Sequence, residues 1–75
     1  KERDMINRLT ENGFKANAHG DAYDCGEYRV YFDDTEMHVI KFTDTSGRQI
    51  IEWDSAIDVN MGVDKAMSVI KAMMS

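Results

Sequence analysis

The sequence predicts an α+β fold of order α-β-β-β-α, in which a three-stranded antiparallel sheet lies between two terminal helices. Apolar residues recur with helical spacing before residue 13 and after residue 62, and with a spacing of two residues in between. The 75 residues leave room for only one core, which all five elements must share. We therefore expect both helices to pack on one face of the sheet, in a single domain over residues 1–75.

The first helix is predicted from Met5, Ile6 and Leu9, which fall on one side of it. Asn12-Gly13-Phe14 marks its end, because glycine can adopt the left-handed conformation of a C-terminal cap and the phenylalanine can fold back onto the last apolar turn. The short polar pattern of residues 14–19 fits either a brief edge strand or a loop.

The first long strand is predicted over residues 27–32, where Tyr28, Val30 and Phe32 alternate with polar neighbours and should face the core. Turn residues at Asp33-Asp34-Thr35 separate it from the next strand, and Asp44-Thr45-Ser46-Gly47 separates that one from a third. The two further strands are expected at residues 36–42 and 48–53. Together the three strands form an antiparallel meander.

Lys41 decides which face of the second strand is buried, because a lysine is unsuited to a core. With Lys41 outward, alternation places His38, Ile40 and Phe42 inward and leaves Met37 and Val39 on the open face. In the third strand the same reasoning expects Ile51 and Trp53 inward, with Ile50 and Glu52 outward.

Residues 54–62 fit two structures. Ser55 with Asp58 three positions later could open a helical turn, whereas Ile57, Val59 and Met61 alternate as in a strand, so we expect a structured connection of either kind. Helical spacing then returns after Gly62, with an apolar stripe of Val63, Ala66, Met67, Ile70, Met73 and Met74.

This layout resembles the double-stranded-RNA-binding domain, whose last helix also begins near a glycine and carries small residues and lysine, here Gly62-Val63-Asp64-Lys65-Ala66. The resemblance implies the fold only. That family binds RNA partly through a basic cluster at the start of its final helix, where this chain has the single base Lys65 beside Asp64. We therefore do not expect RNA binding.

The net charge of −5 lies entirely in residues 21–36, where six carboxylates face one base, Arg29. All three tyrosines and the single cysteine fall in the same stretch. Acidic and amphipathic aromatic side chains together favour a protein-binding surface, although Asp at turns also fits a merely solvated face. The expected binding surface combines this acidic stretch with the adjoining open face of the sheet. Its residues are Asp21, Tyr23, Asp24, Glu27, Tyr31, Asp33, Asp34, Glu36, Met37 and Val39.

Composition excludes several other classes of protein. A pI near 4.8 argues against direct binding of nucleic acid, which depends on clustered lysine and arginine. The sequence contains neither an apolar run of about 20 residues, as a membrane span requires, nor a signal peptide. One cysteine cannot form an intramolecular disulfide, so a cytoplasmic location is expected.

No pattern of catalytic or cofactor-binding residues stands out. His19, Asp21, Asp24 and Cys25 lie close in sequence, but their spacing matches no zinc or calcium motif. Residues 58–64 resemble half a calcium loop, with the glycine one place late and the closing glutamate missing. Cys25 and His38 could form a nucleophile and base, but a core histidine is the simpler interpretation. We expect no enzyme activity, no metal and no cofactor.

The leading hypothesis is a small acidic, non-enzymatic module that binds a basic protein surface. In size and charge it resembles the inhibitors with which phages and mobile elements occupy nucleic-acid-binding grooves of host defence enzymes, including CRISPR effectors; such a protein would be viral, and its carboxylates would replace phosphates. The alternative is a homo-oligomeric module, such as a homodimer, that pairs through Tyr31, Met37, Val39 and Ile50 on the open sheet face.

Overall fold

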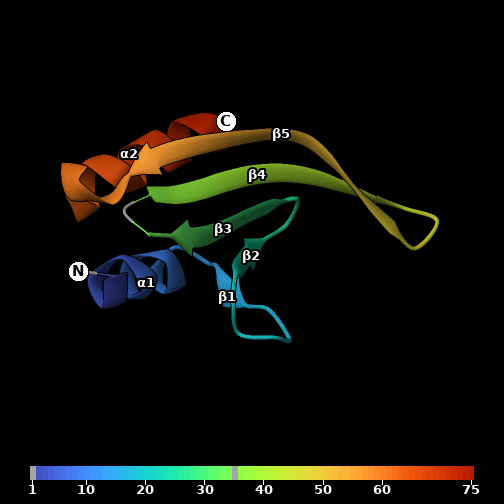
Figure 1. The fold of residues 1–75 in the computed structure, drawn as a ribbon, viewed down its shortest axis with the longest axis horizontal. Helices are drawn as coiled ribbons and strands as arrows, with labels where there is room; N and C mark the ends of the chain where they lie inside the picture. Colours follow the sequence, from blue (N-terminus) through green and yellow to red (C-terminus); the bar gives the residue numbers. More distant parts are fainter. Residues whose placement is uncertain (1, 35) are drawn as a thin grey trace.

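The computed structural model describes residues 2–34 and 36–75 (Figure 1). Over these residues the chain forms two helices, five strands and a short 3-10 helix, η1. Their bounds are α1 (Glu2–Glu11), β1 (Lys15–Ala16), β2 (Tyr23–Cys25), β3 (Tyr28–Asp33), β4 (Glu36–Thr45), β5 (Arg48–Asp58), η1 (Val59–Met61) and α2 (Val63–Met74). In the described residues neither helix is long and apolar enough to cross a membrane.

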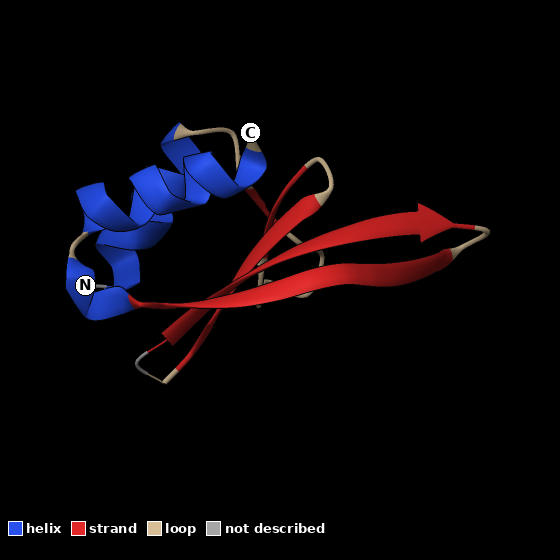
Figure 2. Ribbon diagram, turned by 90° about the horizontal axis from the view of Figure 1, so that it is seen from above, coloured by secondary structure: helices blue, strands red, loops and turns tan. Residues whose placement is uncertain are grey.

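The strands form one antiparallel sheet in the order β1-β2-β3-β4-β5. The α+β class is as predicted, but a three-stranded sheet is an undercount. β1 is the brief edge strand that residues 14–19 allowed, and β2 was missed because three residues are too few to show an alternating pattern. Both helices lie on the same face of the sheet (Figure 2).

The core lies between this face and the helices. Met5 and Leu9 from α1 meet Ala66, Met67 and Ile70 from α2. Phe14 is 1% exposed and its N–H donates to the carbonyl of Leu9, while Gly13 takes a φ of 90°. The helix end predicted at Asn12-Gly13-Phe14 is therefore confirmed, and it returns the chain toward the sheet.

The buried face of β4 is the opposite of the one expected. Met37 and Val39 have no exposed surface and lie in the core, beside Val30 of β3 and Ile57 of β5. Since side chains alternate along a strand, His38, Ile40 and Phe42 point away from the helices. The expectation that these three residues face the helices is therefore wrong, although Ile40 and Phe42 are buried as expected, at 6% and 8% exposure on the opposite face.

Lys41 explains the error. It does share a face with Val39, but it lies at the edge of the region that the helices cover, between Tyr28, which donates to the Met74 carbonyl at the end of α2, and Trp53 of β5. Its Nζ sits 5.9 Å from the centre of the Tyr28 ring and 3.9 Å from Oε1 of Glu52. A lysine at the rim of a core can bury its alkyl chain and keep its charge solvated, so it does not exclude its face from burial.

β5 continues through Asp58, well beyond the predicted end at residue 53. Trp53 packs against the core as expected, whereas Ile51 is 58% exposed and the inward placement predicted for it is wrong. A β-bulge at Glu52 separates the two residues. The chain then enters η1, where the Asp58 carboxylate accepts a hydrogen bond from the Asn60 N–H at 2.8 Å.

Beyond the bulge, β4 and β5 leave the helices and project as an arm, which we define as residues 43–51 (Figures 1 and 2). The arm contributes to a molecular length of 37 Å, against 22 Å in the other two directions. Ser46 and Gly47 at its tip have φ values of 54° and 76°. Two such residues form the tight turn that matches the twist of paired strands.

Candidate protein-binding face

The face of the sheet opposite the helices, called the open face below, carries carboxylates in cross-strand rows. Strand pairing places Asp33, Glu36 and Asp58 side by side on β3, β4 and β5. The next row is Tyr31, His38 and Ala56, and the third is Asp24, Arg29, Ile40 and Asp54. Neighbours within a row share a face and lie on strands about 4.8 Å apart, so their charges act on one surface.

His38 lies at the centre of this face, within reach of three carboxylates. Its Nδ1 is 3.1 Å from Oδ1 of Asp54, and its Nε2 is 3.9 Å from Oε1 of Glu36 and 4.0 Å from Oδ2 of Asp33. The carboxylate side chains are 45–69% exposed, whereas that of His38 is 19% exposed. The acidic groups therefore remain available to a partner while the imidazole fills the space between them.

Tyr31 stacks on His38, with ring centres 4.8 Å apart and planes 7° from parallel. Partial burial raises the pKa of the Tyr31 phenol above its ordinary value, and the nearby charges of Asp54 and Asp33 raise it further. A phenol with the ordinary value of 10.0 is already protonated near neutral pH, so the Tyr31 hydroxyl can donate a hydrogen bond. A stacked, pre-oriented tyrosine of this kind is a frequent contact residue in protein interfaces.

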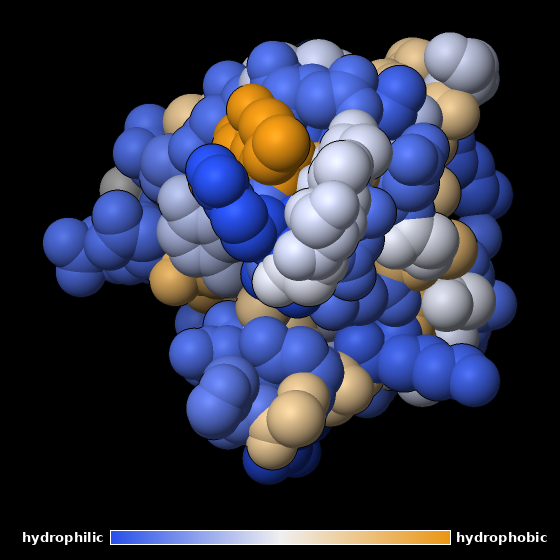
Figure 3. Space-filling model, turned by 90° about the vertical axis from the view of Figure 1, so that its right-hand side faces the viewer, coloured by the Kyte–Doolittle hydropathy of each residue, from blue (hydrophilic) through white to orange (hydrophobic). Residues whose placement is uncertain are grey.

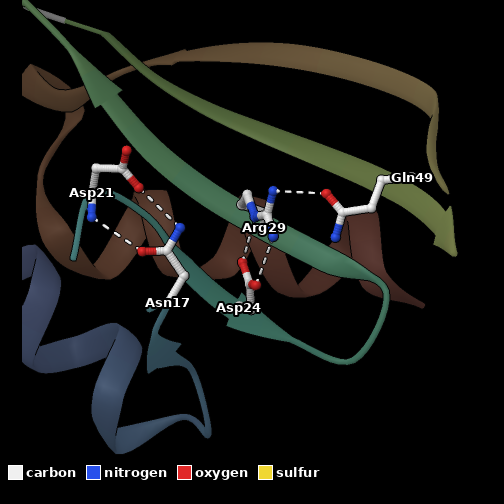
Figure 4. A network of polar contacts seen from close by, with 5 residues as sticks. All are labelled: Asn17, Asp21, Asp24, Arg29 and Gln49. Atoms are coloured by element: carbon white, nitrogen blue, oxygen red, sulfur yellow. Dashed lines mark hydrogen bonds and ion pairs between the residues drawn. The ribbon is translucent and has the colours of Figure 1, made fainter. Parts of the chain in front are cut away.

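Arg29, the only base of the acidic stretch, is already paired. Its Nε and Nη2 donate to the two oxygens of Asp24 at 2.7 and 2.9 Å, and Nη1 donates to Oε1 of Gln49 at 3.3 Å (Figure 4). The guanidinium also covers the Phe42 ring at 4.9 Å, and the hydrogen bond to Asp24 raises the pKa of Arg29. This bidentate pair offsets the charge of Asp24.

Asp21 lies at the rim of the open face. Its Oδ1 accepts from Nδ2 of Asn17 at 2.9 Å, and its N–H donates to Oδ1 of the same asparagine at 3.1 Å (Figure 4). Asn17, Asp21, Arg29 and Tyr31 line a shallow hollow of about 250 Å³. The loop between β1 and β2 thus extends the acidic face past β3.

Half of the expected partner-binding residues share this face: Asp21, Asp24, Tyr31, Asp33 and Glu36. The others do not join them. Tyr23 lies on the helix side, edge-on to Phe32 with ring centres 6.4 Å apart, and Glu27 is at the turn between β2 and β3. The expectation that Met37 and Val39 are outward is wrong, because both are core residues.

Asp34 lies at a different place, at the turn after β3. It borders a cleft of about 380 Å³ between the first turn of α1, the end of β3 and the start of α2. Met5, Phe32 and Val63 supply part of the apolar lining, and Glu2 and Asp4 stand with Asp34 at its edge. Asp34 therefore does not contribute to the open face.

Sequence reasoning missed Asp54, Asp58 and the central position of His38. All three depend on the true length and register of β5, which pairs Asp58 with Glu36 and Ala56 with His38. The alternation of Trp53, Ser55 and Ile57 with Asp54, Ala56 and Asp58 was the available signal. It was obscured because the alternation can be continued into Val59 and Met61, which the structure places in η1.

The possible catalytic pair is not assembled. Cys25 pairs with Tyr28 and packs against the core on the helix side, whereas His38 points from the open face. Across residues 2–34 and 36–75, no group of three His, Cys, Asp or Glu side chains is placed to hold a metal together.

Comparisons of the chain with family models, with curated proteins and with solved structures found no match. The open face is the feature of the described structure in which acidic, aromatic and exposed side chains coincide. Its function has to be inferred from that geometry.

Proposed function

We propose that this protein is a small non-enzymatic binding module whose open face docks on a basic surface of a partner protein. The observation that carries the proposal is the arrangement of Asp33, Glu36 and Asp54 around the stacked pair of Tyr31 and His38. The carboxylates attract lysine and arginine, and the aromatic pair supplies a semi-rigid apolar contact at the centre.

The charge balance of the face supports a basic partner. Asp21, Asp33, Glu36, Asp54 and Asp58 are left after Arg29 has paired with Asp24. Like charges held this close repel one another and reduce the stability of the fold. A partner that supplies lysine or arginine relieves this repulsion, so part of the binding energy is already built into the free protein.

The surfaces that fit best are those that ordinarily bind nucleic acid, since they present arginine and lysine to a regular array of phosphates. On the open face, carboxylates in neighbouring rows replace those phosphates. In this role the protein is an inhibitor that competes with DNA or RNA, as anti-defence proteins of phages and mobile elements do. Release by moderate salt is the expected signature.

Homo-oligomerisation through the open face is the less well supported alternative. That alternative required Met37 and Val39 to stand beside Tyr31 and Ile50, and both residues are buried beneath the helices. The centre of the open face is acidic, which opposes pairing with a second identical face.

A pair of matched variants tests the proposal. Asp33→Asn with Asp54→Asn removes two carboxylates beside His38, whereas Glu11→Gln with Asp64→Asn removes two beside Arg8 on the helix side. Both variants lose the same amount of charge. Each is immobilised as bait for a cell lysate, and bound proteins are eluted first with salt and then, in a parallel sample, with added duplex DNA.

We expect the wild type and the Arg8-side variant to retain a nucleic-acid-binding protein that either salt or DNA releases, and the open-face variant to lose it. Equal retention by the two variants would overturn the proposal, because net charge alone would then account for binding. If added DNA did not release the captured protein, the proposal that the open face mimics nucleic acid would be overturned, and only docking through acidic residues would stand.

A further inference from the structure

The arm carries the large apolar side chains that the described structure leaves in water. Ile50 is 49% exposed and Ile51 is 58% exposed, and they are neighbours on β5. Figure 3, which looks onto the end of the molecule toward which the arm projects, shows strongly hydrophobic atoms at the surface among hydrophilic ones. The arm extends beyond both helices (Figures 1 and 2), in agreement with the exposure of the two isoleucines.

β5 is also an edge strand. The sheet order places it beside β4 alone, so one side of an 11-residue strand has no strand partner in the described chain. Alternate N–H and C=O groups of such a strand point outward and can pair with another strand. Over residues 54–58 the carboxylates of Asp54 and Asp58 discourage such pairing, but residues 48–51 carry only Arg48 as a charge.

The sequence of the arm is complementary to itself. Arg48 and Ile50 pair with Thr45 and Thr43 of β4 and so share one side of the arm. Glu52, the bulged residue, lies on that same side, because its carboxylate contacts Thr43 and Lys41. If two copies of β5 pair antiparallel with Ile50 opposite Ile50, each Arg48 stands opposite the Glu52 of the other copy. Opposite charges at directly facing positions stabilise an antiparallel pair.

We propose that the arm is a dimerisation element, and that its partner is the same segment of a second copy of this chain, paired antiparallel about Ile50. The contact is isologous, with two Arg48–Glu52 pairs flanking the two isoleucines. Glu52 is 42% exposed in the free chain, where it lies near Lys41 and accepts from Thr43, and it can therefore still accept from an incoming arginine.

The paired sheets would continue across the interface. A two-fold axis through such a pair stands perpendicular to the sheet, so both open faces point to the same side. The acidic surface proposed above is then doubled. Arg48 and Glu52 lie outside that surface, and substitutions at them separate dimerisation from docking.

Charge exchange tests the pairing. Arg48→Glu places carboxylates opposite carboxylates, and Glu52→Arg places guanidinium groups opposite one another. Each single variant is measured by sedimentation over a range of concentrations, then the two are mixed, and the double variant Arg48→Glu with Glu52→Arg is measured alone. The folded state of each variant is checked by amide NMR spectra, since Glu52 also contacts Lys41.

We expect the wild type to reach twice its mass of 8.6 kDa, and the dissociation constant of each single variant to rise by about tenfold or more. The equimolar mixture of single variants and the double variant should both recover the dimer. A wild type that stays monomeric, or single variants that dimerise as well as the wild type, would overturn the proposal. So would a mixture of folded single variants that fails to associate.

Discussion

The two faces of the sheet are made from alternate residues of the same strands, yet they differ in almost every physical property. On the helix side, Val30, Met37 and Val39 are fully buried in a core without a single buried charge among the described residues. On the open side, the alternating neighbours include Tyr31, His38 and a set of exposed carboxylates. The helix side therefore supplies most of the buried core, whereas the open side keeps its carboxylates in solvent and buries only Ile40 and Phe42 of β4.

The strongest test of this division introduces the same charge on each face. Val39→Asp buries an unpaired carboxylate and should lower the free energy of unfolding by more than about 4 kcal/mol, enough to unfold a domain of this size. Ala56→Asp places its carboxylate on the exposed open face and should cost less than about 1 kcal/mol. Chemical denaturation measures both. Similar losses in the two variants would show that the faces are not distinct.

The two ends of β5 differ in the same way, because the part that packs against the helices is buried and the arm is exposed. Ile57 is 4% exposed, so Ile57→Ala should cost about 2–5 kcal/mol through lost burial and the cavity left behind. Ile51→Ala on the arm should change the stability of the monomer by no more than about 0.5 kcal/mol. Thermal unfolding at low protein concentration checks both values, and a large loss at Ile51 would mean that the arm is packed.

Repulsion on the open face should make the stability depend on salt. Added salt screens the carboxylates around His38, and we expect it to raise the melting temperature of the wild type. The rise should be smaller in Asp33→Asn with Asp54→Asn, and should persist in Glu11→Gln with Asp64→Asn. Calorimetry across a salt series makes the measurement, and a loss of the effect in both variants would place its origin in net charge rather than on this face.

A smaller effect concerns the ionisation of Tyr31. Its raised pKa means that the folded chain holds the phenol proton to a higher pH than the unfolded chain does, so the unfolded state ionises first and stability falls as the pH rises above the ordinary value of 10.0. Removing the charges of Asp54 and Asp33 should bring the pKa of Tyr31 part of the way down. NMR titration of the tyrosine ring carbons follows this residue separately; an unchanged pKa in the Asp33→Asn, Asp54→Asn variant would leave burial as the sole cause.

Helical periodicity predicted both helices, because each apolar stripe is long enough to define the buried side of its helix. The need for one shared core predicted that both helices lie on the same face of the sheet. The prediction of which side of β4 is buried was wrong because of one residue. Lys41 was expected to face solvent, and it does reach solvent, but from the rim of the buried face, where Tyr28 and Glu52 accommodate its ammonium. Side chains alternate between the two faces of a strand, so one residue assigned to the wrong face moves every other residue of that strand to the wrong face as well.

The acidic face was foreseen only in part for a related reason. The carboxylates of residues 21–36 are visible as a run in the sequence, but Asp54 joins them through the register of β5, which a bulge at Glu52 shifts by one residue. A bulge leaves no clear mark in a single sequence. Asp34 shows the converse: it belongs to the run, yet the turn directs it to the cleft beside α1.

The most direct test of the central claim is to map where a basic ligand lands. An oligolysine peptide is titrated into the isotope-labelled protein, and the amide shifts are followed at low and at moderate salt. We predict that the largest shifts cluster at Asp33, Glu36, His38 and Asp54, and that salt abolishes them. Shifts centred on the cleft formed by Glu2, Asp4 and Asp34, or spread evenly over the surface, would contradict the account.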